Sequence, residues 1–352
     1  MFRARFPTAH HWTVSLFGCQ YHGGLLSHAR QQLVDAFDSL IKSDALHVVE
    51  LEQTDIPSKV WLSYWGSPQS FKSWWESPRV VSFWINLPSN NAGFWRETVS
   101  LPATRSIYES NQDRTSGSSF CAEVLPLPEK TGYWGAYHSR ITPDDGGKSF
   151  SSPLESVPER RPFTQNIRHG RIRMKSLPDN LCFVIEGQDY SAMSPVELEY
   201  WNRNFDNLAK QWVHNVVTGG STKGLVSARG CDRSFKDENH GGFTEGNVDT
   251  KVTSSNNTEV QAYPFNIRSK CQVQLLFWLD ISKMEHMGKW DQVHVKLRRG
   301  FMQEYGPGGA MEGSDLLLWV DLGIVKGKEI DAEYIGGYDS TGFMAYDDHP
   351  SF

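Results

Sequence analysis

Residues 273–278, VQLLFW, form a short apolar run that is typical of a buried β-strand. They precede a candidate helix that begins after Ser282, with Glu285 as the partner in a capping box. The same arrangement occurs earlier, where VWLSYW at residues 60–65 precedes a helix that begins at Ser67. Both helices carry a tryptophan. This similarity indicates an internal repeat, although coincidence between two Trp-rich strand–helix units would produce the same pattern.

Further helices and strands surround these two units. Apolar spacing and capping residues predict helices over about residues 28–41, from Ser67-Pro68 to Pro78, and from Ser194 to Gly219-Gly220. Strand-like segments lie at residues 12–19, 46–52, 60–65, 181–186, 225–230, 273–279 and 316–325. Each half therefore follows the order β-α-β-β-α-β. The predicted class is α+β, with two ferredoxin-like modules of the dimeric α+β barrel type, antiparallel sheets and flanking helices.

The two halves are expected to meet near residues 145–165, where glycine and proline cluster. We expect an N-terminal ferredoxin-like half at residues 1–150 and a C-terminal half at residues 151–352, joined in one compact unit. Two polar stretches without periodicity, residues 111–119 and 232–257, are predicted to be loops. The second is long enough to be a lid or a disordered insertion.

Composition excludes several classes of protein. The 352 residues are 39% hydrophobic and 22% charged, which suits a chain with a buried core rather than a disordered one. The formal charge of −6 offers little to nucleic acid or to an anionic membrane surface. Aromatic residues are abundant, with 13 Trp, 12 Tyr and 19 Phe. They indicate either bulky packing layers or a flat apolar pocket.

The cysteines and the N-terminus predict a compartment. Five widely spaced cysteines without a CxxC pair disfavour a disulfide framework and a structural zinc site. The first residues, MFRARFPTAHH, lack the apolar segment of a signal peptide, and no run of 18 apolar residues follows. We therefore expect a cytoplasmic protein.

Familiar catalytic signatures, such as GxGxxG after a strand, a P-loop, HExxH and GxSxG, are absent from the sequence. His294 is the histidine of most interest. If the helix that begins after Ser282 extends that far, Met284, Met287, Trp290 and His294 form one apolar stripe. A single inward histidine among Trp and Met suits an axial haem ligand better than a zinc cage. The alternative is a core histidine with satisfied hydrogen bonds.

Ser227 is a second candidate. Strand alternation predicts that its side chain lies on the face opposite Val226 and Ala228. On an inward face, one hydroxyl can orient a substrate through a hydrogen bond. Since Arg229 shares that face, simple surface alternation is the better local explanation of the pattern.

Several short blocks occur in order over nearly the whole chain. They are GCQY at 18–21, GFWRE at 93–97, GYWG at 132–135, NL at 180–181, GQD at 187–189, GLVS at 224–227, Trp290 before His294, and TGF at 341–343. In these blocks the chain resembles the haem-containing aldoxime dehydratases (the phenylacetaldoxime dehydratase family), in a divergent, fungal-type form. Each block is short, and their shared order makes the resemblance specific.

The resemblance implies an enzyme with haem b in its C-terminal half. The family dehydrates aldoximes, R–CH=N–OH, to nitriles and is a group of carbon–oxygen lyases. The oxime nitrogen binds ferrous iron directly, so the metal acts as a Lewis acid and electron donor. His294 matches the proximal ligand, and Ser227 matches the serine that hydrogen-bonds the oxime hydroxyl. The resemblance also implies a homodimer that acts on a small apolar aldoxime, with no nucleic acid and no membrane as partner.

The sequence departs from the family at the groups that move protons. Val320 stands at the position of the distal histidine, and Ile185 with Glu186 stands near that of the distal arginine. Neither Val320 nor Ile185 can transfer a proton. Glu186, Asp321 and His138 are the remaining candidates for this role, although alternation places Asp321 on the face opposite Val320.

Trp290, Trp319 and Val320 are the expected wall of the haem pocket. Two other functions stay open. The first is a haem enzyme on the same scaffold that acts on another N–O or N–N compound, which the missing distal residues favour. The second is a non-catalytic protein that binds haem or a hydrophobic ligand, in which proton-transfer residues would have no use.

Overall fold

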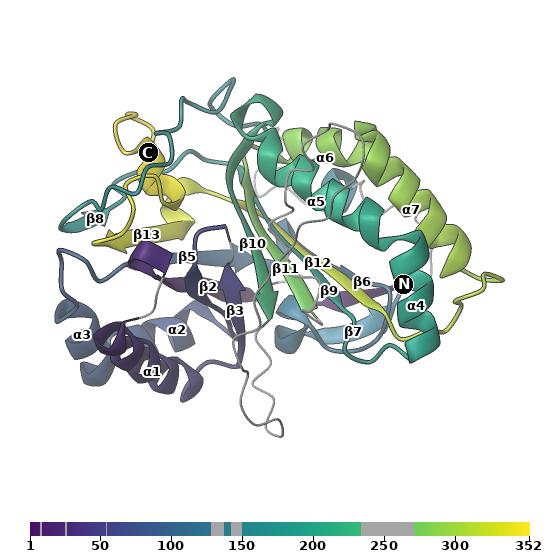
Figure 1. Ribbon diagram of the computed structural model, residues 1–352, viewed down its shortest axis with the longest axis horizontal. Coiled ribbons are helices and arrows are strands. Elements are labelled where there is room, and N and C mark those ends of the chain that lie inside the picture. The colour runs from purple at the N-terminus through teal and green to yellow at the C-terminus, as the bar shows by residue number, and fades with distance from the viewer. Residues whose placement is uncertain (8, 25–26, 54, 128–136, 142–149, 234–270) are drawn as a thin grey trace, which may run out of the picture.

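The computed structural model describes residues 1–352 except 8, 25–26, 54, 128–136, 142–149 and 234–270 (Figure 1). The strands of the described part form one antiparallel sheet in the order β7-β1-β6-β12-β9-β11-β10-β3-β4-β2-β5-β13-β8. The strands are β1 Phe2–Arg5, β2 His11–Gln20, β3 His47–Gln53, β4 Ser58–Trp65, β5 Phe94–Pro102, β6 Ser106–Ser110, β7 Glu123–Pro126, β8 Arg171–Arg173, β9 Leu181–Asp189, β10 Leu225–Arg233, β11 Cys271–Trp278, β12 Leu317–Val325 and β13 Ile330–Ile335. The α-helices are α1 His28–Lys42, α2 Pro68–Trp75, α3 Pro78–Ile85, α4 Pro195–Asn204, α5 Asp206–Gly219, α6 Ile281–Trp290 and α7 Gln292–Glu304.

Two sets of elements share one topology. In the N-terminal half β2, β3, β4 and β5 lie in the order β3-β4-β2-β5, with α1 after the first strand and α2 and α3 after the third. In the C-terminal half β9, β10, β11 and β12 lie in the order β12-β9-β11-β10, with α4 and α5 after the first and α6 and α7 after the third. The α+β class is confirmed. The ferredoxin-like identity of the halves and the boundary between residues 1–150 and 151–352 stay predictions.

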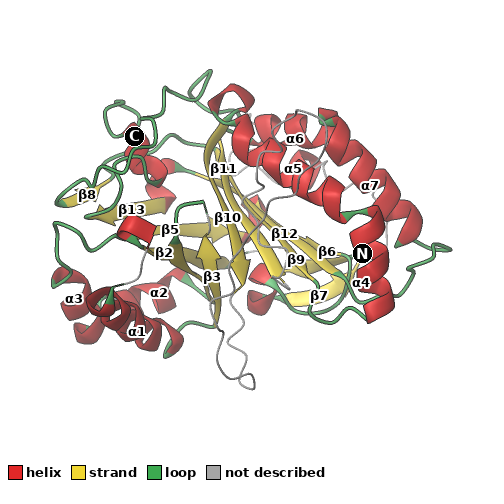
Figure 2. Ribbon diagram, viewed as in Figure 1, coloured by secondary structure: helices red, strands yellow, loops and turns green. Residues whose placement is uncertain are grey.

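The sheet folds its two halves toward each other, and helices cover the outer faces. Helices α1–α3 lie on the N-terminal half and α4–α7 on the C-terminal half (Figures 1 and 2). Contacts between the halves run through the middle: Tyr64 Oη on β4 donates a hydrogen bond to Asp321 on β12 over 3.0 Å. The Arg229 guanidinium on β10 likewise binds the Glu97 carboxylate on β5, with contacts of 2.6 and 2.8 Å. We call the apolar layer between the halves the central core. It includes Phe183, Phe277, Trp319 and Phe343.

Most predicted elements are confirmed. The seven predicted strands match β2, β3, β4, β9, β10, β11 and β12, and the first two predicted helices match α1 and α2. The helix predicted from Ser194 to Gly219 is interrupted at Phe205, whose φ of −126° and ψ of −32° lie outside helical geometry. Strand β10 continues to Arg233, so the first two residues of the loop predicted at 232–257 belong to a strand. Residues 234–257 of that stretch lie outside the described residues.

One difference concerns the candidate ligand directly. The helix predicted to begin after Ser282 instead has Asp280 as its N-cap, with the Asp280 carboxylate accepting a hydrogen bond from the Lys283 amide. It ends at Trp290, and a second helix begins at Gln292. Asp291 ends the first helix in extended geometry (φ −66°, ψ 120°) and caps the second by accepting from the His294 amide over 2.9 Å. The predicted continuous stripe is therefore broken just before His294.

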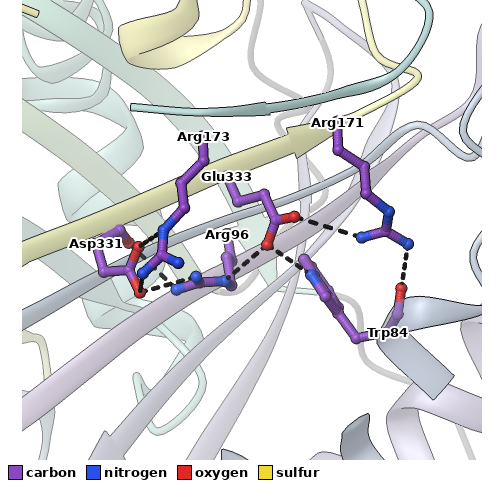
Figure 3. A network of polar contacts seen from close by, with 6 residues as sticks. All are labelled: Trp84, Arg96, Arg171, Arg173, Asp331 and Glu333. Carbon is purple, nitrogen blue, oxygen red and sulfur yellow. Dashed lines mark hydrogen bonds and ion pairs between the residues drawn. The ribbon is translucent and has the colours of Figure 1, made fainter. Parts of the chain in front are cut away.

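A polar network joins β13 to the N-terminal half (Figure 3). Arg96 of β5 and Arg173 of β8 both contact the Asp331 carboxylate, at 2.8 and 3.2 Å. Glu333 accepts from the Trp84 indole over 2.8 Å and pairs with Arg171 at 3.3 Å. Because these groups come from α3, β5, β8 and β13, the network fixes the last strand against α3 and β5 from early in the chain and β8 from its middle.

The described residues contain no helix that is long and apolar enough to cross a membrane. The five cysteines are free, and four of them are buried.

Candidate active site

Five residues lie in register across the C-terminal half of the sheet. Val320 of β12 is paired with Glu109 of β6 on one side and with Glu186 of β9 on the other. Glu186 is paired with Gln274 of β11, which in turn is paired with Gly230 of β10. Directly paired residues project to the same face of a sheet, and Val320 packs in the apolar layer beneath the helices. We call this set the helix-facing row.

The helices opposite the row supply an aromatic and apolar lining. Trp212 of α5 and Met284 and Met287 of α6 are buried in the same apolar layer as Val320. His294 of α7 stacks on Trp212, with ring centroids 4.2 Å apart and ring planes 28° from parallel. Trp212 thus packs between the candidate ligand on α7 and the sheet.

The hydrogen bond of His294 determines which of its nitrogens is available. Nδ1 is bonded to the carbonyl oxygen of Gly288, and a carbonyl can only accept, so Nδ1 carries the proton. Nε2 then has a lone pair, and within the described part of the chain it has no hydrogen-bond partner. Burial lowers the pKa of His294, which keeps the ring neutral. A neutral imidazole whose other nitrogen donates to a carbonyl is the usual form of a metal-ligating histidine.

Glu186 is the row's most perturbed carboxyl group. It is half-buried beneath the helices. Burial raises its pKa to about 7, while the indole N–H of Trp212 favours the charged form and offsets part of that rise. A carboxyl group with a pKa near 7 can exist in both protonation states near neutral pH. It is therefore suited to donate and to recover a proton.

Glu109, which lies at the β6 end of the row, forms an ion pair. The Glu109 carboxylate is fully buried, and it binds the Arg140 guanidinium over 2.5 Å. Burial raises the pKa of Glu109, and the neighbouring positive charge of Arg140 opposes that rise. One oxygen, Oε2, has no hydrogen-bond partner among the described residues.

The same face contains further buried polar atoms without partners. Among the described residues, neither side-chain atom of Gln274, Nε2 or Oε1, has a hydrogen-bond partner, although the residue is only 2% exposed. The indole N–H of Trp278 on the same strand also has no partner in the part of the chain that the structure describes. Buried polar groups are almost always hydrogen-bonded in native proteins. Their absence of partners here indicates a site that a bound molecule completes.

These residues fit haem as the bound group. The donor is one neutral imidazole, whereas no group of three or more His, Cys, Asp or Glu side chains in the described part could hold a bare metal ion. A porphyrin supplies its own four nitrogen ligands and needs only an axial one. Trp212, Met284 and Met287 add the apolar surface that a flat macrocycle buries.

Ser227 lies on the other face of the sheet. It is paired with Phe277, which packs in the central core against Phe183 and Phe343. A β-bulge between Leu225 and Ser227 breaks the simple alternation, so that Val226 also lies on the central-core face, in contrast to the prediction. The structure does not bring Ser227 and His294 together. The role that the resemblance implies for Ser227 stays a prediction.

Asp321 and Trp319 also face the central core. The Asp321 carboxylate is fully buried and accepts hydrogen bonds from the Tyr64 hydroxyl and from Ser118. Burial raises its pKa to about 6, with these hydrogen bonds opposing the rise. The Trp319 ring lies over Gly187, where a Cβ atom would come within 2.0 Å of it. Both residues are therefore separated from His294 by the sheet.

Trp290 and His138 lie at the surface instead of lining the row. Trp290 is 58% exposed, because α6 ends there and the chain turns at Asp291 before α7. His138 lies in a 3₁₀ helix, Tyr137–Arg140, where its backbone N–H and its Nδ1 both contact the Glu285 carboxylate of α6. Its side chain is 60% exposed.

Sequence reasoning missed Trp212, Gln274, Glu109 and Arg140 as parts of this site. One signal was available for Gln274, which is the single amide within the apolar run VQLLFW. In a strand buried on both faces a polar residue needs a partner. For Glu109 and Arg140 no local pattern exists, because 31 residues separate the two partners.

Comparisons with known proteins add independent findings. A family model described as haem-containing dehydratase matches residues 15–343. A phenylacetaldoxime dehydratase from Bacillus sp. (strain OxB-1) is 24% identical over 294 residues, covering 82% of this chain and 73% of that protein.

Two solved structures share the fold. One is an aldoxime dehydratase in complex with butyraldoxime, with a TM-score of 0.74 and 15% identity over 97% of this chain and 88% of the other. The second is another aldoxime dehydratase structure, with a TM-score of 0.75 and 16% identity over 97% and 90% of the two chains.

Proposed function

Because this chain belongs to the haem-containing dehydratase family, we propose that it dehydrates aldoximes to nitriles, as a carbon–oxygen lyase. One observation carries the proposal. His294, whose Nε2 is available, lies on α7 opposite the helix-facing row of the sheet. The phenylacetaldoxime dehydratase named above supports an aldoxime as the substrate. A non-catalytic binding protein is less well supported, because the matching family model and the curated relative are both dehydratases.

His294 is the residue that would hold haem b. Its Nδ1–H is fixed on the Gly288 carbonyl and its ring on Trp212, so both the tautomer and the ring orientation are set before the cofactor binds. When bound, haem b supplies ferrous iron, which acts as a Lewis acid and electron donor toward the oxime nitrogen.

Glu186 is the residue that would move the proton. In its protonated form it donates a proton to the departing hydroxyl, so that the N–O bond breaks and water leaves. Its carboxylate then accepts the hydrogen of the aldoxime carbon as the C≡N bond forms. The reaction R–CH=N–OH → R–C≡N + H₂O therefore balances, and Glu186 returns to its starting state. A pKa of about 7 suits both halves of this cycle near neutral pH.

Glu109 and Val320 would shape the rest of the pocket. The Arg140 guanidinium neutralises the buried charge of Glu109. Without that neutralisation, the negative charge of Glu109 would raise the pKa of nearby carboxyl groups further. Val320 presents an apolar side chain at the position where the resemblance implies a histidine. An apolar surface there favours a substrate with a hydrophobic R group and excludes water, which strengthens the few polar contacts.

The assembly and location that the resemblance implies also belong to this proposal. We propose a homodimer in the cytoplasm. Light scattering after size-exclusion chromatography tests the dimer, which predicts about twice the 40.0 kDa mass of one chain. Fractionation of the source cells tests the location.

The activity is tested with purified protein to which haem has been added. The dithionite-reduced holoprotein is incubated with phenylacetaldoxime without oxygen, and phenylacetonitrile is measured by chromatography. We expect nitrile formation that depends on both haem and reductant. Haem binding without nitrile would contradict the proposed reaction, and a lack of haem affinity would contradict the cofactor as well.

A further inference from the structure

Gln274 is a buried amide whose side chain makes no hydrogen bond to any described residue. It is 2% exposed, and neither Nε2 nor Oε1 has a partner in the described part of the chain. An amide in this state costs folding free energy, since it loses its bonds to water and gains none in return. A Leu or Met in the same place would avoid that cost. The amide therefore indicates a use that the protein alone does not show.

The position of Gln274 indicates what that use is. It lies directly opposite Glu186 on the neighbouring strand, and its other neighbour in the row is Gly230, which has no side chain. Paired side chains on adjacent strands lie about 4.5–5.5 Å apart at Cβ. The amide and the carboxyl group of Glu186 therefore share one small polar patch, which is surrounded by Val184, Leu276 and other apolar residues of the helix-covered face.

The chemistry of the amide matches the hydroxyl group of an oxime. A Gln side chain offers one acceptor oxygen and an NH₂ donor group. An oxime hydroxyl offers one O–H donor and oxygen lone pairs. The nitrile product has no donor, and an O-methyl oxime has none either. The two unsatisfied atoms of Gln274 are thus complementary to the substrate's leaving group and not to the product.

We propose that Gln274 binds the oxime hydroxyl, with Oε1 accepting from the O–H and Nε2–H donating to the oxygen. This inference rests on the proposed aldoxime dehydration and specifies how the substrate is recognised. Gln274 thereby holds the leaving hydroxyl beside Glu186, which donates the proton. It also selects free aldoximes over their O-alkyl ethers, and it loses its partner when the nitrile forms, which favours product release.

The test compares Gln274→Met with the wild type in the oxidised, ferric holoprotein, which the proposed reaction does not use. Binding of phenylacetaldoxime and of its O-methyl ether is followed by the change in the Soret band. We expect the wild type to prefer the free oxime by about 10-fold or more, and Gln274→Met to reduce that preference to about threefold or less. Gln272→Met is the matched control, because Gln272 lies on the same strand and face and is paired with Gln188. It should keep the preference.

A second readout does not depend on turnover. Without substrate, Gln274→Met should melt a few degrees higher than the wild type, because it removes a buried group without partners. Gln274→Leu repeats the measurement if the methionine variant does not fold. An unchanged preference for the free oxime in a variant that keeps its haem would overturn the assignment of Gln274. If instead the wild type forms no nitrile and shows no oxime-dependent change, the proposed function fails independently of Gln274.

Discussion

The imidazole of His294 stacks on the indole of Trp212, and the same indole contacts Glu186 on the sheet. One aromatic side chain therefore touches both the proposed haem ligand and the proposed proton carrier. Trp212 comes from α5, His294 from α7 and Glu186 from β9. A change at Trp212 should consequently affect iron ligation and proton transfer together.

Replacing His294 with alanine should remove the axial ligand. We expect His294→Ala to lose haem affinity by more than the roughly 10–100-fold that loss of an outer-shell partner causes. Added imidazole should restore part of the ligand-field spectrum. Absorbance and haem content measure both effects. His286→Ala is the control, because His286 is exposed on α6. If His294→Ala keeps normal haem content and ligation, the axial assignment is wrong.

Replacing Trp212 with phenylalanine should shift the pH dependence of turnover. The proposed general acid must be protonated, so kcat should fall as the pH rises above about 7. The Trp212 N–H lowers the pKa of Glu186, and Phe has no such donor, so Trp212→Phe should move this limb to higher pH by about half a unit. A pH series of kcat from 5.5 to 9 measures it. A limb that stays in place or moves to lower pH would show that another group titrates.

Glu186 should also affect stability, with a definite sign. Its folded pKa is about 7, against an ordinary value of 4.5 for a glutamate, so between these values the folded chain retains a proton that the unfolded chain has lost. Stability is therefore lost as the pH rises through this window. Glu186→Gln should remove the loss and be more stable than the wild type by about 1–3 kcal/mol at pH 8, but nearly equal at pH 4.5.

Urea denaturation of the protein without haem at the two pH values measures this difference. Glu159→Gln, at an exposed position, is the control and should show no such pH dependence. An equal stability difference at both pH values would mean that Glu186 does not titrate with a raised pKa.

The family resemblance and the strand register give Ser227 different roles, and the Ser227→Ala variant decides between them. The resemblance implies that its hydroxyl orients the oxime, whereas the strand register places it with Phe277 on the central-core face. From the register we expect Ser227→Ala to change kcat/KM by less than about threefold, because the sheet separates it from His294. A loss of about 100-fold, the low end of what a catalytic group supplies, would favour the resemblance and require a different local register.

Much of the fold could be predicted from the sequence because both faces of its strands are apolar. Most residues of strands β4 and β11 are apolar, and both strands are buried throughout. Helices α1 and α2 follow capping residues and amphipathic spacing. The short strands β1, β7 and β8 could not be predicted, since pairing with distant parts of the chain stabilises them rather than their own three or four residues.

The site was harder to predict, for two physical reasons. Register is not encoded locally, so the sequence does not reveal that Glu186 and Gln274 face each other, or that a bulge turns Val226 toward the central core. A single cap also outweighed apolar spacing at Asp291, where the chain starts a new helix and leaves Trp290 exposed. His294 nevertheless lies where the apolar layer meets α7, as a candidate ligand should.

The role of Glu186 is best tested by the rate at which reduced Glu186→Gln holoprotein forms phenylacetonitrile under anaerobic conditions. Gln is nearly isosteric with Glu but cannot exchange a proton near pH 7. We predict a rate at least about 100-fold below that of the wild type, with haem content and aldoxime binding retained. A variant that binds haem and forms nitrile at the wild-type rate would contradict the central role of Glu186 and of the row that holds it.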